Sequence, residues 1–113
     1  MANLLFICSR NQWRSPTAEK IFSGRPGIAV RSAGTSPRAR RRVTMPDLRW
    51  ADIVFVMEKK QRQQLLARFR QYARTRNIVV LNIPDDYQPM DPELVALLEE
   101  RVTPHLISLT APG

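Results

Sequence analysis

Four short apolar segments recur along the chain, and stretches with helical spacing of apolar residues separate them. The segments are residues 4–7, 28–30, 53–57 and 78–83, and each is nearly continuous in apolar residues rather than alternating. A short continuous apolar run is typical of a parallel strand that is buried on both faces. The pattern therefore predicts four strands of one buried parallel sheet.

A helix is predicted directly after the first strand. Ser15 offers an N-cap and Pro16 a proline in the first turn, while Ala18, Ile21 and Phe22 fall on one face. The glycines and proline of residues 24–27 should end this helix. Between the second and third strands, residues 36–51 show no long amphipathic period. We expect a loop there, with one short helical turn near residues 46–50.

Two further helices follow the third and fourth strands. One is predicted from Glu58 to about Tyr72, with apolar residues at helical spacing. The other begins at Asp91-Pro92, an N-cap followed by a proline in the first turn. Pro104 should kink or end this last helix, because proline cannot donate the backbone hydrogen bond of a helix interior.

The alternation of strands and helices predicts an α/β fold, a small doubly wound four-stranded parallel sheet flanked by helices. At 113 residues, the chain is expected to form one domain over residues 1–113. Parallel strands all end at one edge of their sheet, and ligands bind in the crevice there. We therefore expect Cys8, Ser32, Glu58 and Asp85 to be neighbours in space.

The charge of the chain is unevenly distributed. Residues 1–80 hold 17 Lys and Arg against 4 Asp and Glu, a net charge of +13, whereas residues 81–113 have a net charge of −5. Arginine supplies 15 of the 18 basic residues, and its planar guanidinium suits bidentate contacts with oxyanions. Such a field attracts phosphoesters, nucleic acids or acidic proteins without choosing among them. Compositional bias alone would explain most of the exposed arginines.

Composition also limits the class of protein. No apolar run approaches the length of a membrane span, and the N-terminus lacks the zones of a signal peptide, so we expect a cytoplasmic protein without a membrane partner. A single cysteine cannot form an internal disulfide. Without cysteine or histidine partners for it, we expect no metal site, and no feature indicates a cofactor.

The single cysteine lies at the junction between the first strand and the first helix. Cys8 and Arg14 form a C-x5-R motif, in which the backbone N–H groups of residues 9–14 can surround one anion beside a helix N-terminus. Arg14 can clamp two phosphoryl oxygens, and the same field stabilises a thiolate aligned for in-line attack. The alternative is that Cys8 is a small buried residue that ends a core strand. Asn11 favours the anion loop, because asparagine tolerates the left-handed conformation of a tight turn.

The stretch LLFICSRNQWRSPTAEKIF, residues 4–22, resembles the phosphate-binding loop of the low-molecular-weight protein tyrosine phosphatases. The resemblance continues through SAGT at residues 32–35, Val43-Thr44, ADIVFVME at residues 51–58 and the acidic DDY at residues 85–87. It implies a four-stranded sheet of the phosphotyrosine phosphatase I-like type. It also implies metal-free hydrolysis of a phosphomonoester through a phosphocysteine intermediate.

The resemblance assigns roles to residues of the loop. Cys8 matches the nucleophile, Arg14 the phosphate-binding arginine and Ser15 the serine that supports the thiolate. Asn11 matches the asparagine that stiffens the loop, and Ser32 the serine that holds this asparagine. The remaining loop residues are expected to contribute to phosphate or substrate binding, namely Ser9, Arg10, Gln12 and Trp13.

The general acid of the family is an aspartate in a loop after the fourth strand. Counting back from Leu94 in the last helix places this acid at Asp85 and an aromatic residue of the pocket rim at Tyr87, with Asp86 as the second choice for the acid. Such a carboxyl protonates the leaving oxygen and then deprotonates the attacking water. The alternative is that Asp85 and Asp86 are turn residues beside Pro84.

Three positions in the first half of the chain depart from the family pattern. Arg10 replaces a loop glycine, which strains the loop if the position needs an unusual backbone angle and otherwise adds a charge at the pocket mouth. Trp13 replaces a second loop cysteine that can trap an oxidised nucleophile as a disulfide, so peroxide inactivation should lack this protection. A long segment after Thr35 is missing, and Arg38 aligns with a buttressing histidine. Much of the leaving-group pocket is then either absent or rebuilt from residues 38–42, Trp13 and Tyr87. This leaves phosphotyrosine, phosphoarginine and more open phosphoesters as substrates.

Three functions follow, in order of preference. The first is a cysteine-dependent phosphatase acting on a phosphorylated protein or a small phosphomonoester. The second is a catalytically weak module that binds phosphate or a phosphoprotein, with the arginines of residues 38–42 addressing an acidic partner. The third, nucleic-acid binding by those arginines, is not expected, because no nucleic-acid-binding motif accompanies them. Arsenate reductases share the loop, but their mechanism needs cysteines that this chain lacks.

Overall fold

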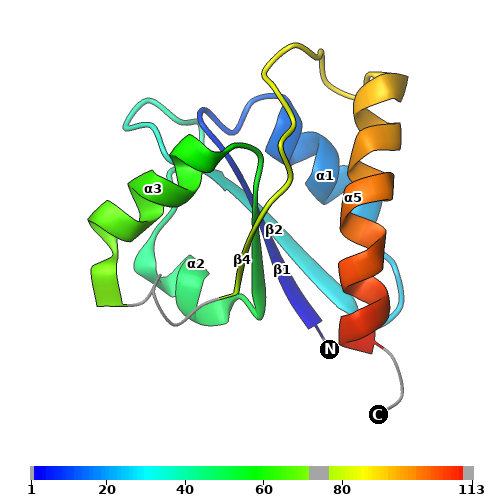
Figure 1. Cartoon of the computed structure of the whole chain (residues 1–113), viewed down its shortest axis with the longest axis horizontal. Coiled ribbons are helices and arrows are strands. Elements are labelled where there is room, and N and C mark those ends of the chain that lie inside the picture. Colours follow the sequence, from blue (N-terminus) through cyan, green and yellow to red (C-terminus); the bar gives the residue numbers. More distant parts are fainter. Residues whose placement is uncertain (1, 72–76, 111–113) are drawn as a thin grey trace.

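The computed structural model describes residues 2–71 and 77–110, and a parallel sheet lies at the centre of the molecule (Figure 1). Its strands are β1 (Ala2–Cys8), β2 (Ile28–Gly34), β3 (Ile53–Val56) and β4 (Ile78–Val80). They lie in the order β2-β1-β3-β4, and every neighbouring pair is parallel. The predicted four-stranded parallel α/β fold is confirmed.

Helices cover both faces of this sheet. Figure 1 shows α1 (Arg14–Phe22) and α5 (Pro92–Thr110) on one side and α2 (Met45–Trp50) and α3 (Lys59–Arg68) on the other. Because the side chains of a strand alternate between faces, Leu4 and Phe6 of β1 join the cluster under α1 and α5, and Leu5 and Ile7 join the cluster under α2 and α3. None of these four side chains is exposed to solvent, which explains the continuous apolar run.

The start of α1 differs from the prediction. Trp13 rather than Ser15 occupies the N-cap position, and it makes no side-chain capping bond. Ser15 lies inside the first turn, where its hydroxyl is 3.0 Å from Cys8 Sγ. The capping hydroxyl that the sequence indicated is therefore used for a contact with the thiol instead.

The short helical turn predicted near residues 46–50 is confirmed as α2. Thr44 and Asp47 form a reciprocal capping box, in which Thr44 Oγ1 accepts from the Asp47 N–H and the Asp47 carboxylate accepts from the Thr44 N–H. Asp47 is buried and also pairs with Arg41. On its own, burial would raise the pKa of Asp47, but the bonds from Arg41 and Thr44 hold it below its ordinary value.

The two later helices end at different positions from those predicted. Helix α3 ends at Arg68 with Phe69 as its C-cap, and Tyr72, the predicted end, lies outside the described residues. Helix α5 has the predicted cap, since Asp91 Oδ1 accepts from the Glu93 N–H at 2.9 Å. Of the two effects predicted for Pro104, a kink or an end of the helix, the end does not occur, because the helix continues to Thr110. Pro104 is exposed, so water can reach the carbonyl that loses its partner.

Candidate active site

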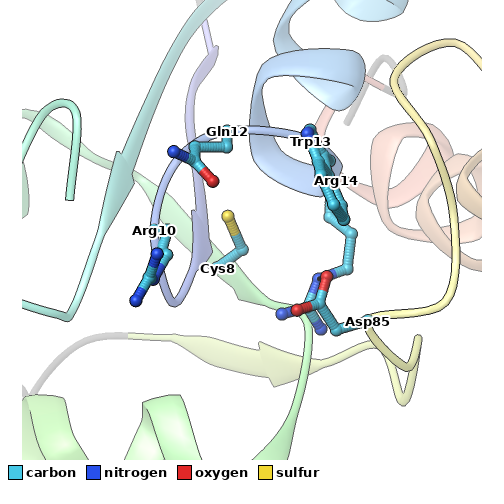
Figure 2. Close-up of a pocket in the computed structure, with 6 residues that line it drawn as sticks. All are labelled: Cys8, Arg10, Gln12, Trp13, Arg14 and Asp85. Carbon is cyan, nitrogen blue, oxygen red and sulfur yellow. Dashed lines mark ion pairs between the residues drawn. The ribbon is translucent and has the colours of Figure 1, made fainter. Parts of the chain in front are cut away.

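A pocket of about 210 Å³ opens at the carboxyl end of β1. Figure 2 shows its lining side chains, with Cys8 Sγ at the centre, Arg10 on one side, and Arg14 with Asp85 on the other. The pocket combines the end of β1, the segment of residues 8–14, which we name the thiol loop, and the segment of residues 82–91, which we name the acid loop. Its lining residues are Cys8, Arg10, Gln12, Trp13, Arg14 and Asp85.

The Cys8 thiol is the polar group at the base of this pocket. Only 3% of Cys8 is exposed, and its Sγ accepts the backbone N–H of Asn11 at 3.1 Å. The Ser15 hydroxyl lies 3.0 Å from the same sulfur. When Cys8 is a thiolate, the hydroxyl can only donate, so two donors then converge on the negative sulfur. Hydrogen bonds to the charged form favour that form.

A chain of buried hydrogen bonds holds Asn11 behind the pocket. Its backbone is in the left-handed region (φ 55°), as the sequence analysis expected of a tight anion loop. Its Nδ2 donates to Ser15 Oγ at 2.9 Å and to Ser32 Oγ at 3.0 Å, so the expected contact with Ser32 is present. Ser32 in turn donates to Glu19 Oε1 at 2.6 Å. Sequence reasoning missed Glu19, although it lies one helical turn after Ser15 on α1.

The guanidinium of Arg14 forms the wall of the pocket opposite Arg10. Arg14 is 2% exposed, and its Nη1 donates to Glu58 Oε1 at 2.5 Å and to the Ile83 carbonyl at 2.8 Å. Its Nε lies 3.6 Å from Asp85 Oδ1. Glu58, which follows β3, and the acid loop, through Ile83 and Asp85, therefore both orient one arginine. Sequence reasoning placed Glu58 at this edge but gave it no role.

Glu58 also connects α3 to the thiol loop. On its own, burial would raise the pKa of Glu58, but the hydrogen bond and charge of Arg14, helped by Lys60 and Gln61, hold that pKa below its ordinary value. Glu58 is therefore a carboxylate at neutral pH. The fully buried Gln61 accepts a hydrogen bond from the Glu58 N–H and donates one to Ser9 Oγ at 3.1 Å. The first turn of α3 is therefore hydrogen-bonded to the thiol loop.

Residues 35–42, which we name the arginine loop, run beside the thiol loop and are hydrogen-bonded to it. Three backbone N–H groups, at residues 35, 36 and 40, donate to the carbonyls of residues 8, 9 and 10 at 2.9–3.0 Å. Gly34 directly precedes this loop, and a Cβ added to it would lie 2.6 Å from the Ser9 carbonyl oxygen and 2.6 Å from Ala39 Cβ. Only glycine at position 34 allows the two loops to approach this closely. Sequence reasoning did not assign Gly34 a role in the site.

Arg10 and Arg38 occupy two of the positions that depart from the family pattern. Arg10 is exposed and does not adopt a positive φ, so it adds a charge at the pocket mouth without straining the loop. Arg38, which aligns with a buttressing histidine, is also exposed, and its own N–H bonds Ser36 Oγ. The buttress behind Asn11 is Glu19 acting through Ser32.

The acid loop presents Asp85 to the pocket. Asp85 is 58% exposed beside Arg14, whereas Asp86 is exposed and does not line the pocket. Tyr87, the expected rim residue, is not among the lining residues but packs against the cluster under α1 and α5. Its partial burial and the carboxylates of Glu93, Asp86 and Asp91 raise its pKa above the ordinary value. Arg101 Nη1 fixes the start of the loop by donating to the carbonyls of residues 81 and 82.

Of the other predicted binding residues, Gln12 and Trp13 line the pocket, whereas Ser9, Ser15 and Ser32 are not among its lining residues. Ser15 contacts Cys8 directly, Ser32 accepts from Asn11, and Ser9 accepts from Gln61. Within residues 2–71 and 77–110, no cluster of three or more His, Cys, Asp or Glu side chains is arranged to hold a metal ion. In the same residues, no helix has both the length and the apolar character needed to span a membrane.

Comparisons with known proteins give matches in structure only. No family model matches the sequence, and no curated protein matches it. Among solved structures, the low-molecular-weight protein tyrosine phosphatase SP-PTP from Streptococcus pyogenes superposes with a TM-score of 0.77 at 18% identity, over 99% of this chain and 95% of that one. The tyrosine phosphatase Wzb from Escherichia coli K30, in complex with phosphate, gives 0.77 at 21% identity, over 95% and 97%.

The chain has the fold of the low-molecular-weight protein tyrosine phosphatases. The YwlE arginine phosphatase from Geobacillus stearothermophilus shares this fold, with a TM-score of 0.73 at 20% identity over 100% of this chain and 99% of that one. Proteins named for phosphotyrosine and for phosphoarginine are thus both among the structural neighbours.

Proposed function

We propose that the protein is a metal-independent phosphomonoester hydrolase that acts through a phosphocysteine intermediate on Cys8. One observation carries the proposal: a buried thiol with two hydrogen-bond partners lies at the base of a pocket that an arginine and a carboxyl group also line. A phosphate-binding module needs the arginine and the loop amides, but it needs neither the thiol nor the acid. The shared fold supports the same conclusion.

In the first step, the Cys8 thiolate attacks the phosphorus of the bound monoester. The S–P bond forms as the P–O bond to the leaving group breaks, and Asp85 gives its proton to the departing oxygen. Arg14 and the N–H groups of the thiol loop stabilise the negative charge on the equatorial oxygens. Glu58 holds Arg14 at the pocket wall through Nη1.

In the second step, water hydrolyses the phosphocysteine. The Asp85 carboxylate takes a proton from the water as its oxygen attacks phosphorus, and the S–P bond breaks to release phosphate. Ser15 and the Asn11 N–H stabilise the thiolate that leaves. The residues of the chain thus supply nucleophile, acid, base and charge stabilisation for both steps.

The substrate that we propose is a phosphorylated protein or a small phosphomonoester. The named activities of the structural neighbours make phosphotyrosine and phosphoarginine the first substrates to compare. With phosphoarginine the bond that breaks is P–N, and Asp85 would give its proton to the leaving nitrogen. A cytoplasmic location stays a prediction, as does the absence of nucleic-acid and membrane partners.

Hydrolysis of p-nitrophenyl phosphate in excess EDTA tests the proposal, with Cys8→Ser and Asp85→Asn beside the wild type. We expect activity that survives EDTA and falls roughly a thousandfold or more in Cys8→Ser. Asp85→Asn should lose less, because nitrophenolate leaves with little protonation. Activity that EDTA abolishes, or that Cys8→Ser retains, contradicts the mechanism. Absent turnover together with Arg14-dependent phosphate binding would indicate the binding module instead.

A further inference from the structure

The charges around the pocket mouth are arranged asymmetrically. Arg10 lines the mouth on one side, opposite Arg14 and Asp85 (Figure 2). The arginine loop continues this side with exposed side chains at Arg38 and Arg40. Within the described parts of the chain, no ion pair involves Arg10, Arg38 or Arg40. These cations are therefore available to a ligand.

The opposite side of the mouth has the opposite charge. Figure 1 shows the acid loop, in yellow, on the other side of the thiol loop from the arginine loop. Asp85 lines the pocket there, and Asp86 is exposed next to it. Asp85 has Arg14 as a partner at 3.6 Å, while Asp86 adds a negative charge outside the pocket. A chain crossing this mouth would meet cations at one end and an anion at the other.

The cationic side is held in a fixed position relative to the thiol. The Arg40 N–H donates to the Arg10 carbonyl at 3.0 Å, and the arginine loop makes two further backbone bonds to residues 8 and 9. At Gly34 the two loops approach so closely that an added Cβ would lie 2.6 Å from the Ser9 carbonyl oxygen. Arg41 anchors the loop from within by donating to the Ser32 carbonyl and to Asp47. The backbone of Arg40 is thus fixed next to Arg10, which lines the mouth.

We propose that Arg10 and Arg40 form a subsite that selects phosphopeptides with acidic residues on one side of the phosphorylated residue. The inference rests on the proposed function, which places the phosphoryl group next to Cys8, and adds a preference for the residues that flank the phosphorylated one. A carboxylate near Arg10 would gain attraction, whereas a carboxylate near Asp86 would be repelled, so the preference has a direction along the peptide.

The size of the effect follows from the exposure of these arginines. One exposed ion pair favours its ligand by roughly 1.4- to 5-fold, so two such contacts would favour an acidic over a neutral flank by about two- to thirtyfold at low salt. The preference should weaken as ionic strength rises, because screening shortens the Debye length from about 10 Å at 0.1 M salt to about 3 Å at 1 M.

The test compares three phosphotyrosine peptides of equal length. One has two Glu residues before the phosphotyrosine, one has two Glu residues after it, and one has Gln at all these positions. We measure kcat/KM with the wild type and peptide dissociation constants with Cys8→Ser. One of the two acidic peptides should exceed the neutral peptide by about two- to thirtyfold in both measurements. The other should not exceed it.

The double variant Arg10→Gln/Arg40→Gln should bring the ratio of acidic to neutral peptide close to one. The matched control is Arg70→Gln, which removes an exposed arginine outside the mouth and should leave that ratio unchanged. Thermal unfolding of each variant shows whether it is folded. Phosphate inhibition constants separate weakened phosphate binding from the loss of the flanking preference.

The outcomes distinguish failure of this inference from failure of the proposed function. Equal values for all three peptides, or equal gains for both acidic peptides, would overturn the directional subsite even if turnover depends on Cys8. Selective binding without turnover would support the subsite and refute the hydrolase. Displacement of the acidic phosphopeptide from Cys8→Ser by a tighter-binding single-stranded RNA would show a nucleic-acid surface instead and would overturn the inference.

Discussion

Arg14 Nη1 lies 2.5 Å from Glu58 Oε1, and the same nitrogen donates to the Ile83 carbonyl at 2.8 Å. Two bonds on one nitrogen fix the orientation of the guanidinium before any ligand binds. The wall of the pocket is therefore preorganised, and the cost of ordering the arginine is met during folding rather than during binding. Glu58 is a positioning residue in this arrangement.

Replacing Glu58 with Gln should destabilise the protein by about 2 kcal/mol at pH 7. The substitution keeps an acceptor for Arg14 but removes the nearer of its two counter-charges. The cost is smaller than for a fully buried pair, because Glu58 is partly exposed and Asp85 stays 3.6 Å from the guanidinium. Urea unfolding measures the difference. The control Glu99→Gln removes the partner of the exposed Arg25 and should cost less than about 0.5 kcal/mol. Equal losses in both variants would contradict the special role of Glu58.

The stability that Glu58 contributes should depend on pH. Its pKa in the folded protein lies below the ordinary value of 4.5, so its contribution is fully present above that value. As the pH falls through the folded pKa, the contribution is lost, and the free energies of unfolding of wild type and Glu58→Gln should converge. Asp47 titrates in both proteins and cancels in the difference. A difference that stays constant from pH 7 to pH 3 would show that the charge is not responsible.

Gly34→Ala should reduce both stability and turnover. The new Cβ would lie 2.6 Å from the Ser9 carbonyl oxygen and 3.0 Å from the Asn11 nitrogen, so the thiol loop must shift, at a cost of about 2 kcal/mol. The control is Gly27→Ala, where the strain comes from a φ of 79° and no atom lies within 4 Å. It should cost about 1 kcal/mol with kcat for p-nitrophenyl phosphate unchanged. Unchanged kcat in Gly34→Ala would contradict the proposed fit between the two loops.

Hydrophobic pattern was sufficient to predict the fold because the two central strands, β1 and β3, are buried on both faces. Residues 4–7 are fully buried, and the sequence shows the apolar run directly. Helix ends were harder to predict, because tertiary contacts override local preference. The Ser15 hydroxyl contacts the thiol instead of capping α1, and α5 continues past Pro104 because the affected turn faces solvent.

The residues that bind directly at the pocket could be found from the motif, whereas their supports could not. Cys8, Arg14 and Asp85 come together because parallel strands end at one edge of the sheet. Glu19 and Glu58 act through other side chains, and their partners are 13 and 44 positions away in sequence. No local sequence pattern indicates such a pairing, so the roles of Glu19 and Glu58 can be identified only from the three-dimensional contacts.

Asp85 and Asp86 should differ sharply in their kinetic effects. Asp85 lines the pocket beside Arg14, and Asp86 does not, which favours Asp85 as the proposed general acid. In Asp85→Asn, kcat for phenyl phosphate should fall roughly a hundredfold or more, and kcat for p-nitrophenyl phosphate should fall less, because only the poorer leaving group needs the proton. Asp86→Asn should change both rates by less than about threefold. The reverse ranking would move the acid to Asp86.

Prolonged exposure to hydrogen peroxide should inactivate the protein irreversibly. Cys8 is the only cysteine, so its sulfenic acid cannot be captured as an internal disulfide and is open to further oxidation. Dithiothreitol should then fail to restore activity, and mass spectrometry should find two or three added oxygen atoms on Cys8.

Trp13→Cys provides the matched test of this account. Trp13 lines the pocket with Cys8, at the position where the family resemblance places a second thiol. If the wild type is inactivated irreversibly because it lacks a second thiol, Trp13→Cys should form an internal disulfide under peroxide and recover its activity in dithiothreitol. Trp13→Ala removes the same side chain without adding a thiol and should stay as sensitive as the wild type. Recovery of the wild type after prolonged exposure would instead mean that another group protects the thiol.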